Sequence, residues 1–535
     1  MPGTAPCSGL HTSPSKQPCR HIQAQFQRAI GSCHRLFRAS QSGAAQRGRG
    51  LSPALSRGRQ RDPCRLRATQ EAASAVQTPL QGLLQWAVDN GVRGIGQADS
   101  KVAIYETDQE ERGMLAVQEV AEDEVLFSVP LRLALTDATS KHDGLKGGTW
   151  LSRLAAQVLE RKTAATSPWQ PYIQALPHAA DPQPFLPSSE AVLESGVPLG
   201  QLSPTLIPRL RTVEDLLPGI TAQLREFSPQ EVQWAMQLVQ SRACGTMDKQ
   251  GEPVRMLVPL MDMLNHQGDE SELLPSQPVT VRENARWDLV QHDGQWEMQV
   301  SAMRPLEAGE EVSLSYEERE NEYFLVQYGF VPMSNVHDAV QLFSSTDAAE
   351  AWCKHHQAGR VPSLYEEPQQ MAQLQPSGLP LEQQHQVPIL QLHTGARMDP
   401  DLVAVFEASS SRTPAHSASQ ELSEKGRQLA LARCWEVLQE GVDPLLRDLA
   451  MLAADQGSDD SEAEVWVRRL QHYRQVVAAA CQKAGSQSLA APAQQQTASN
   501  LLKQGQLSPS ARLILRFVAL KKCVLWDAVT QLLAA

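Results

Sequence analysis

Two short stretches of the sequence hold the residues whose types and spacing are best suited to bind and orient a reacting group. The first is an apolar run that ends in an acid, an amide and an imidazole, at Asp262, Asn265 and His266. The second ends in Tyr316, and a further tyrosine follows at Tyr328. A carboxylate and an imidazole at this spacing could ligate a metal ion, but no third ligand stands nearby, so we predict no metal site.

Each of these residues also has an ordinary structural interpretation. Asn265 and His266 could cap a strand and supply a hydrogen-bonded core histidine. Tyr316 and Tyr328 could be core aromatics, as most tyrosines in such a pattern are. No single residue of the set distinguishes the two interpretations, so the order and spacing of the whole set must decide.

That order and spacing resemble the two C-terminal motifs of SET-domain protein methyltransferases, and most closely those of the Rubisco large-subunit methyltransferase type. In that type Asp-x-x-Asn-His is followed by Gly-Glu-x-Val, by a tyrosine and by Tyr-Gly-Phe. Here the same elements stand at 262–266, 309–312, Tyr316 and 328–330. Asn321, five residues after Tyr316 and seven before Tyr328, also fits the pattern.

The resemblance implies that a methyl group passes from S-adenosylmethionine to a lysine of a protein substrate. Such an enzyme must align donor and acceptor, exclude water and present a neutral amine, and this chemistry needs no metal. Asn265 and the backbone of His266 would then bind the donor. A third stretch resembles the N-terminal Gly-Arg-Gly-Leu-x-Ala motif and would also contact the donor; it contains Arg112, Gly113 and Met114.

For the acceptor, the resemblance implies that Tyr316 orients the target amine and that Tyr328 lines an aromatic channel beside it. A narrow apolar channel lowers the pKa of the lysine amine, which has a free electron pair only once it is deprotonated. The Ser241-Arg242 pair and Asp262 would lie beside the substrate. Arg242 could equally be a salt-bridging residue at the end of a helix.

Two departures from the family pattern keep other functions open. Glu111 stands where a glycine is more common, and Glu317 follows Tyr316 where the family often has glycine. A second hypothesis is therefore a catalytically silent SET-domain protein that binds a partner through its helical part. A third hypothesis keeps the reaction and makes the acceptor a histidine, as in some relatives.

The elements that position these residues are predicted from periodicity and turn signals. A short helix is expected within 75–95, and a second helix starts at Ser228-Pro229 with a capping box. Strands are expected at 102–105, 114–117, 125–130, 285–290 and 296–300, the last two joined by a turn at 292–294. The pattern predicts an α+β fold with a β-rich SET domain over 71–335 and a helical insertion at about 138–250.

The remaining chain, 336–535, is predicted to be an all-α domain, and it resembles the substrate-binding domain that follows the SET domain in this family. Three helices are marked by their apolar periods. They carry Leu431, Trp435 and Leu438; Trp466, Leu470, Tyr473 and Val477; and Leu513, Phe517, Leu520 and Val524. A generic helical interaction domain fits this pattern equally well.

Charge is distributed unevenly. Residues 1–70 hold eleven Arg and one Lys against one acid, a net charge of +11, whereas the whole chain carries −12. An Arg-rich, acid-poor start without an apolar core predicts a transit peptide for the chloroplast stroma, with the mitochondrion second; a nucleic-acid-binding arm is the alternative.

The body has a net charge of −23, no eighteen-residue apolar run and no C-x-x-C pair. We therefore expect a reducing compartment, with no nucleic-acid or membrane partner. We also expect the protein to be a monomer. A plastid enzyme of this type would act on a stromal protein such as Rubisco large subunit or fructose-bisphosphate aldolase.

Overall fold

The structure is a computed structural model that describes residues 78–534. Within this range it leaves out 108–111, 140–147, 165, 178–185, 198, 248–251, 269–281, 358–389, 411–421, 441–444, 456–459 and 484–506. The predicted leader over 1–70 and the departure at Glu111 lie outside the described residues. The described chain combines several small sheets with many helices, so the predicted α+β class is confirmed.

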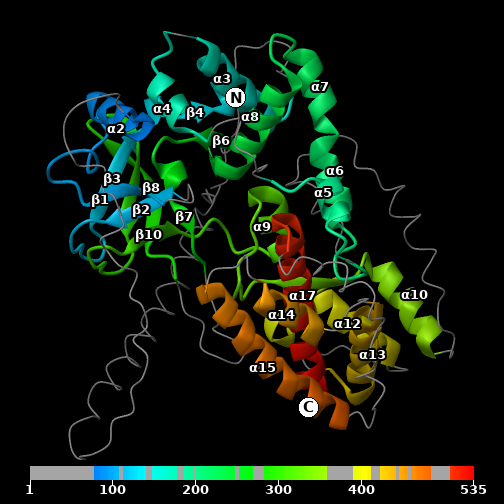
Figure 1. Cartoon of the computed structure of the whole chain (residues 1–535). Helices are drawn as coiled ribbons and strands as arrows, with labels where there is room; N and C mark the ends of the chain where they lie inside the picture. Colours follow the sequence, from blue (N-terminus) through cyan, green and yellow to red (C-terminus); the bar gives the residue numbers. More distant parts are fainter. Residues whose placement is uncertain are drawn as a thin grey trace, which may run out of the picture. The chain divides into compact units, whose positions relative to one another are not determined.

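The strands up to residue 314 form three small sheets (Figure 1). One sheet has the order β1-β2-β10-β7, the second β3-β9-β8 and the third β4-β6-β5. Their bounds are β1 Val102–Glu106, β2 Arg112–Ala116, β3 Val125–Pro130, β4 Leu135–Thr136, β5 Cys244–Met247, β6 Pro253–Leu257, β7 Asn265–His266, β8 Ala285–His292, β9 Gln295–Ala302 and β10 Glu311–Leu314. The predicted strands are all found.

The pairing of β7 with β10 brings the two motif stretches together. These strands run parallel, with Asn265 opposite Ser313 and His266 opposite Leu314. Tyr316 lies just beyond the end of β10, so it comes to lie beside His266. A long connection between the two strands is required because parallel neighbours need a crossover.

The hairpin of β8 and β9 forms as the turn residues dictate. His292 pairs with Gln295, which leaves Asp293 and Gly294 as a two-residue loop. Both loop residues have positive φ, 49° and 75°. Aspartate followed by glycine tolerates this conformation and matches the twist of the two strands.

Helices fill the predicted insertion. They are α3 Trp150–Thr163, α4 Gln170–Ala175, α5 Ser189–Glu194, α6 Leu206–Glu214, α7 Leu216–Gln223 and α8 Pro229–Arg242. Helix α8 starts with the predicted capping box, in which Ser228 and Glu231 each accept a hydrogen bond from the other's backbone N–H. The helix near the start, α2 (Pro79–Asp89), has the same device between Thr78 and Gln81.

After residue 320 the chain is mainly helical. The helices are α9 Asn321–Tyr328, α10 Thr346–Gln357, α12 Pro400–Ser410, α13 Glu424–Glu440, α14 Leu445–Ala454, α15 Asp460–Lys483 and α17 Pro509–Ala534. The three predicted helices correspond to α13, α15 and α17, and α17 packs against α13, α14 and α15 (Figure 1). A two-stranded sheet of β11 (Ala339–Phe343) and β12 (Leu390–His393) is also present, so this part is not purely helical.

Two hydrophobic cores hold the described chain together. One lies among β1–β10, α2–α4, α7 and α8, and the other among α9 and the later elements together with α5 and α6. Helix α9 thus belongs to the second core, although it lies before residue 335, where the SET domain is predicted to end. That domain boundary stays a prediction. None of the helices in the described part of the chain is long and apolar enough to cross a membrane.

Candidate active site

The side chain of Asn265 ties three strands together. Its Nδ2 donates to the Arg112 carbonyl oxygen at 2.9 Å and to Glu311 Oε1 at 2.8 Å. The Tyr105 hydroxyl donates to the same carboxylate oxygen at 2.8 Å. A Cβ at Gly113 would lie 2.8 Å from Asn265 Nδ2, so glycine is needed there to admit this bridge.

The N-terminal motif lies beside Asn265 but lines neither of the two cavities described below. Arg112 pairs with Glu106 at 2.6 Å and donates to the Ala175 carbonyl at 2.8 Å. Met114 is fully buried in the first core, and its strand is paired on both sides. Donor contacts of Arg112, Gly113 and Met114 therefore stay a prediction.

His266 is a half-buried, neutral hydrogen-bond acceptor. Its Nδ1 accepts the backbone N–H of Tyr316 at 3.1 Å, which places the ring proton on Nε2. Burial lowers the pKa of His266 to about 4. The ring packs against Phe324 and Phe330, with centroid distances of 4.6 and 5.7 Å.

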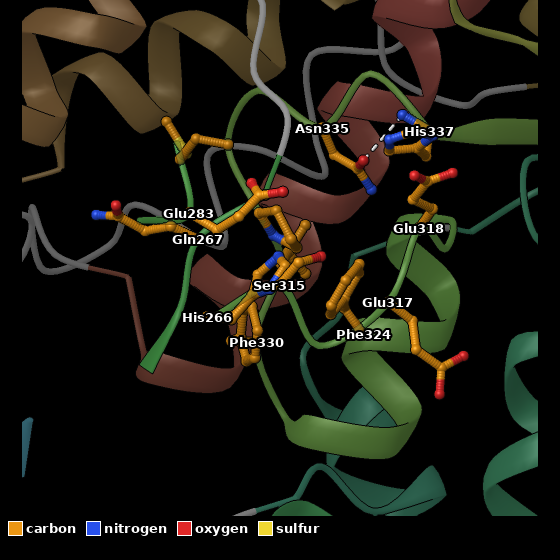
Figure 2. A pocket seen from close by; sticks show the side chains of 14 residues that line it. His266, Gln267, Glu283, Ser315, Glu317, Glu318, Phe324, Phe330, Asn335 and His337 are labelled. Atoms are coloured by element: carbon orange, nitrogen blue, oxygen red, sulfur yellow. Dashed lines mark hydrogen bonds between the residues drawn. The ribbon is translucent and has the colours of Figure 1, made fainter. Parts of the chain in front are cut away.

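A first cavity of about 250 Å³ opens beside His266 (Figure 2). Figure 2 shows His266, Phe324 and Phe330 gathered at its centre, with Glu283 and Gln267 on one side and Glu317 and Glu318 on the other. The remaining lining residues are Gly268, Ser315, Val331, Pro332, Met333, Asn335 and His337. We call this space the first cavity; it offers aromatic faces for a flat ring and carboxylates for a positive charge.

The two predicted catalytic tyrosines lie in contact. The Tyr316 and Tyr328 rings have centroids 4.9 Å apart. The Tyr316 hydroxyl donates to the Leu264 carbonyl at 2.7 Å. Burial raises the pKa of Tyr316 to about 12 and raises that of Tyr328 as well, so both phenols are neutral near pH 7.

A second cavity, of about 240 Å³, brings all five of the predicted acceptor-side residues together. Tyr316 and Tyr328 line it, and so do Ser241, Arg242 and Asp262. The other lining residues are Trp150, Ala243, Cys244, Gly245, Arg255, Met261, Leu264, Trp287, Leu314, Ser315, Glu317, Tyr323 and Gln327. We call this space the second cavity; five of its lining residues are aromatic and four carry a charged group, namely Arg242, Arg255, Asp262 and Glu317.

Asp262 is the buried charge of the second cavity. Its Oδ2 accepts from the Tyr172 hydroxyl at 2.8 Å and lies 3.7 Å from Arg242, whose Nη1 donates to the Asp262 carbonyl at 2.7 Å. Burial raises the pKa of the Asp262 carboxyl, and the positive charge of Arg242 opposes that rise. Arg242 thus braces the motif from the end of α8, as its salt-bridging interpretation predicted.

The two cavities share one short segment of backbone. Ser315 and Glu317 line both of them, and Tyr316 between these residues lines the second. Glu317, which departs from the family pattern and lies within the part of the chain that the structure describes, pairs with Arg319 at 2.6 Å. A donor in one cavity and an acceptor in the other would therefore meet at Tyr316.

Several lining residues were not singled out from the sequence. Tyr172 reaches Asp262 across 90 residues of sequence, and no local pattern could have revealed this contact. Tyr323 and Phe324 lie on α9 within the matched spacing between Asn321 and Tyr328. That spacing was the available signal, because a helix starting at Asn321 turns these residues toward the site.

The described residues contain no group of three or more His, Cys, Asp or Glu side chains that could hold a metal ion. The two potential metal ligands of the first motif have other partners. Asp262 is bonded to Tyr172 and His266 to the backbone of Tyr316.

About half of the chain is similar in sequence to known proteins. No protein-family profile matches. The actin-histidine N-methyltransferases of Mus musculus and Homo sapiens are each 24% identical over 283 residues, which is 49% of this chain and 43% of theirs. The chain thus spans less than half the length of these curated relatives.

Among solved structures, the SET domain of LSMT bound to lysine and AdoHcy is 15% identical, with a TM-score of 0.48, over 74% of this chain and 90% of that one. A structure of Rubisco LSMT bound to AdoMet is 14% identical, with a TM-score of 0.47, over 75% and 92%. The comparisons thus show similarity in sequence to protein N-methyltransferases over about half of the chain. They leave the plastid type and the nature of the acceptor as predictions.

Proposed function

We propose that the protein is an S-adenosylmethionine-dependent protein N-methyltransferase of the SET type, and that its acceptor is a lysine. The observation that carries the proposal is the pair of cavities that share Ser315 and Glu317. Methyl transfer requires a donor and an acceptor that approach in line from two directions. Two cavities meeting beside the half-buried Tyr316 supply that arrangement.

The first cavity fits the methyl donor. Phe324, Phe330 and the neutral ring of His266 give an adenine ring faces to pack against. Glu317 can neutralise part of the sulfonium charge. When bound, the donor supplies an activated methyl group. Asn265 is then a positioning residue, because its side chain bonds strands β2 and β10. His266 has two roles, since its ring packs against the donor and its Nδ1 accepts the backbone N–H of Tyr316.

The second cavity fits a lysine side chain. Its aromatic walls disfavour an ammonium ion and lower the pKa of an entering amine. The only proton of the Tyr316 hydroxyl is donated to Leu264. The phenol oxygen can therefore accept an N–H from the amine and so direct the nitrogen electron pair away from itself.

Calorimetry with the full chain and S-adenosylmethionine tests the proposal, followed by transfer of labelled methyl groups to protein extracts. Binding together with transfer is the expected result. Binding without transfer to any protein would favour the catalytically silent binding protein, and absence of binding would remove the methyltransferase proposal.

Histidine is the second candidate acceptor, because the curated relatives are actin-histidine N-methyltransferases. A neutral imidazole could also donate a ring N–H to a buried acceptor in the second cavity. Mass spectrometry of methylated substrate peptides assigns the modified residue. Methyl-histidine in place of methyl-lysine would overturn the lysine proposal and leave the methyltransferase proposal standing.

We further propose a stromal site of action in the chloroplast, with the mitochondrion second, on the basis of the Arg-rich, acid-poor residues 1–70. Substrates of the Rubisco or aldolase kind follow from that address. Residues 1–70 fused to a fluorescent protein test it. A cytosolic or nuclear signal would contradict it, and a methylation screen of organelle extract would identify the substrate.

A further inference from the structure

The walls of the second cavity are joined by a pair of buried glutamines. Gln240 stands directly before Ser241 and Arg242 at the end of α8, and Gln327 directly before Tyr328 at the end of α9. Both side chains are buried, and Gln327 itself lines the cavity. Neither glutamine belongs to the motifs recognised in the sequence.

The two glutamines cap each other's helices. Gln240 Nε2 donates to the Val326 carbonyl at 2.9 Å, and Gln327 Nε2 donates to the Gln240 carbonyl at 2.7 Å. Each carbonyl belongs to the last turn of its helix, where no N–H of the same helix remains to bond it. The side chain from the neighbouring helix therefore supplies the missing donor in both directions.

The orientation of the Gln240 amide is determined by its surroundings. A carbonyl can only accept, so the nitrogen of Gln240 must face Val326. Its Oε1 is then buried without a hydrogen-bond partner among the described residues. Leaving this oxygen without a donor is unfavourable. The hydrogen bond from Gln240 Nε2 to the Val326 carbonyl of α9 is the interaction that the buried amide makes in this orientation.

We propose that Gln240 and Gln327 form a reciprocal lock that sets the position of Tyr328 relative to Arg242, and thereby the width of the acceptor cavity. This inference rests on the proposed function for its catalytic consequence, but the lock itself does not. Because the bonds lie one residue from both walls, a small shift of either helix end moves the walls of the cavity. Such misplacement lowers turnover and changes which methylated product fits, without touching the donor.

The test uses the full chain with Gln240→Met, Gln327→Met and the double variant. Methionine keeps the length of the side chain and removes the donor. Gln157→Met is the matched control: Gln157 is also buried, and it donates to the Thr136 carbonyl without lining either cavity. Amide hydrogen exchange at the ends of α8 and α9 is read first, because it needs no methyl transfer.

We expect faster exchange at both helix ends in either single variant, little further change in the double variant, and no change there in the control. With an active enzyme, turnover should fall by about ten- to a hundredfold and the ratio of mono- to higher-methylated product should change. Affinity for S-adenosylmethionine should stay within about twofold of the unsubstituted protein, as expected for a change confined to the acceptor side.

Unchanged exchange at both helix ends would overturn the lock. Faster exchange with unchanged turnover and product ratio would overturn its role in positioning. If the unsubstituted protein transfers no methyl group at all, the proposed function fails, and the exchange measurement alone still decides whether the lock exists.

Discussion

Replacing Tyr316 by phenylalanine tests the acceptor site most directly. The ring packs against Tyr328 and His266, with centroid distances of 4.9 and 5.3 Å, and phenylalanine preserves these contacts. What disappears is the hydroxyl and its 2.7 Å bond to the Leu264 carbonyl. The substitution therefore separates packing from hydrogen bonding.

The expected size of the effect follows from the two roles of that hydroxyl. Loss of one hydrogen bond should reduce the free energy of unfolding by about 1 kcal/mol. If the phenol oxygen also accepts an N–H of the target amine in the transition state, turnover should fall by about ten- to a thousandfold. Each factor of ten corresponds to about 1.4 kcal/mol of lost transition-state stabilisation.

Single-turnover methyl transfer, calorimetry with S-adenosylmethionine and urea denaturation measure the three quantities separately. Donor affinity should hardly change, because Tyr316 does not line the first cavity. Turnover equal to that of the unsubstituted enzyme would assign Tyr316 to the core and move the catalytic role to Tyr328. A loss of donor affinity as large as the loss of turnover would place the hydroxyl on the donor side.

Three further predictions concern other parts of the site and the core. Asn265→Ala should weaken donor binding measured by calorimetry, because the bridge to Arg112 and Glu311 is lost; unchanged affinity in a folded protein would show that Asn265 is misassigned. Tyr328→Phe should reduce turnover less than Tyr316→Phe or alter the number of methyl groups added, and mass spectrometry decides. Burial raises the pKa of Asp527 from 3.8 to about 7. Its contribution to stability is thus fully present below about pH 4 and lost as the pH rises through about 7. The pKa of His266 is lowered to about 4, so its contribution to stability increases as the pH rises. The measurement is therefore the difference in unfolding free energy between Asp527→Asn and the unsubstituted chain, which should shift in favour of the variant from pH 4 to 7; a constant difference would contradict this.

The sequence predicted those features whose signals are local. The capping box at Ser228 marks the start of α8, because its side chains bond backbone groups only three residues away. The equivalent box at Thr78, which starts α2, was not singled out from the sequence. The Asp293-Gly294 turn sets the register of β8 and β9 in the same way. The meeting of the two motif stretches followed from their resemblance to a known order and spacing.

Contacts between distant segments were not predictable from these signals. Tyr172 bonds Asp262, and Gln240 bonds α9, across 90 and 86 residues. The strands β11 and β12 were missed because β11 is buried at four of its five positions and shows no alternation of polar and apolar residues. The predicted donor contacts of Arg112, Gly113 and Met114 illustrate a further limit. A motif can place residues in the right strand without showing which side chains face a cavity.

Asn321 shows how the C-terminal helices support the first cavity. Its side-chain oxygen accepts from Asn335, which lines the first cavity, at 2.9 Å. Its backbone N–H donates to Asp338 at 2.9 Å, and Asp338 forms a buried ion pair with Lys521 of α17 at 2.6 Å. Removing one partner of a buried ion pair strongly destabilises the folded protein, because the other charge is left buried and uncompensated. One wall of the first cavity is therefore held in place by the last helix, α17.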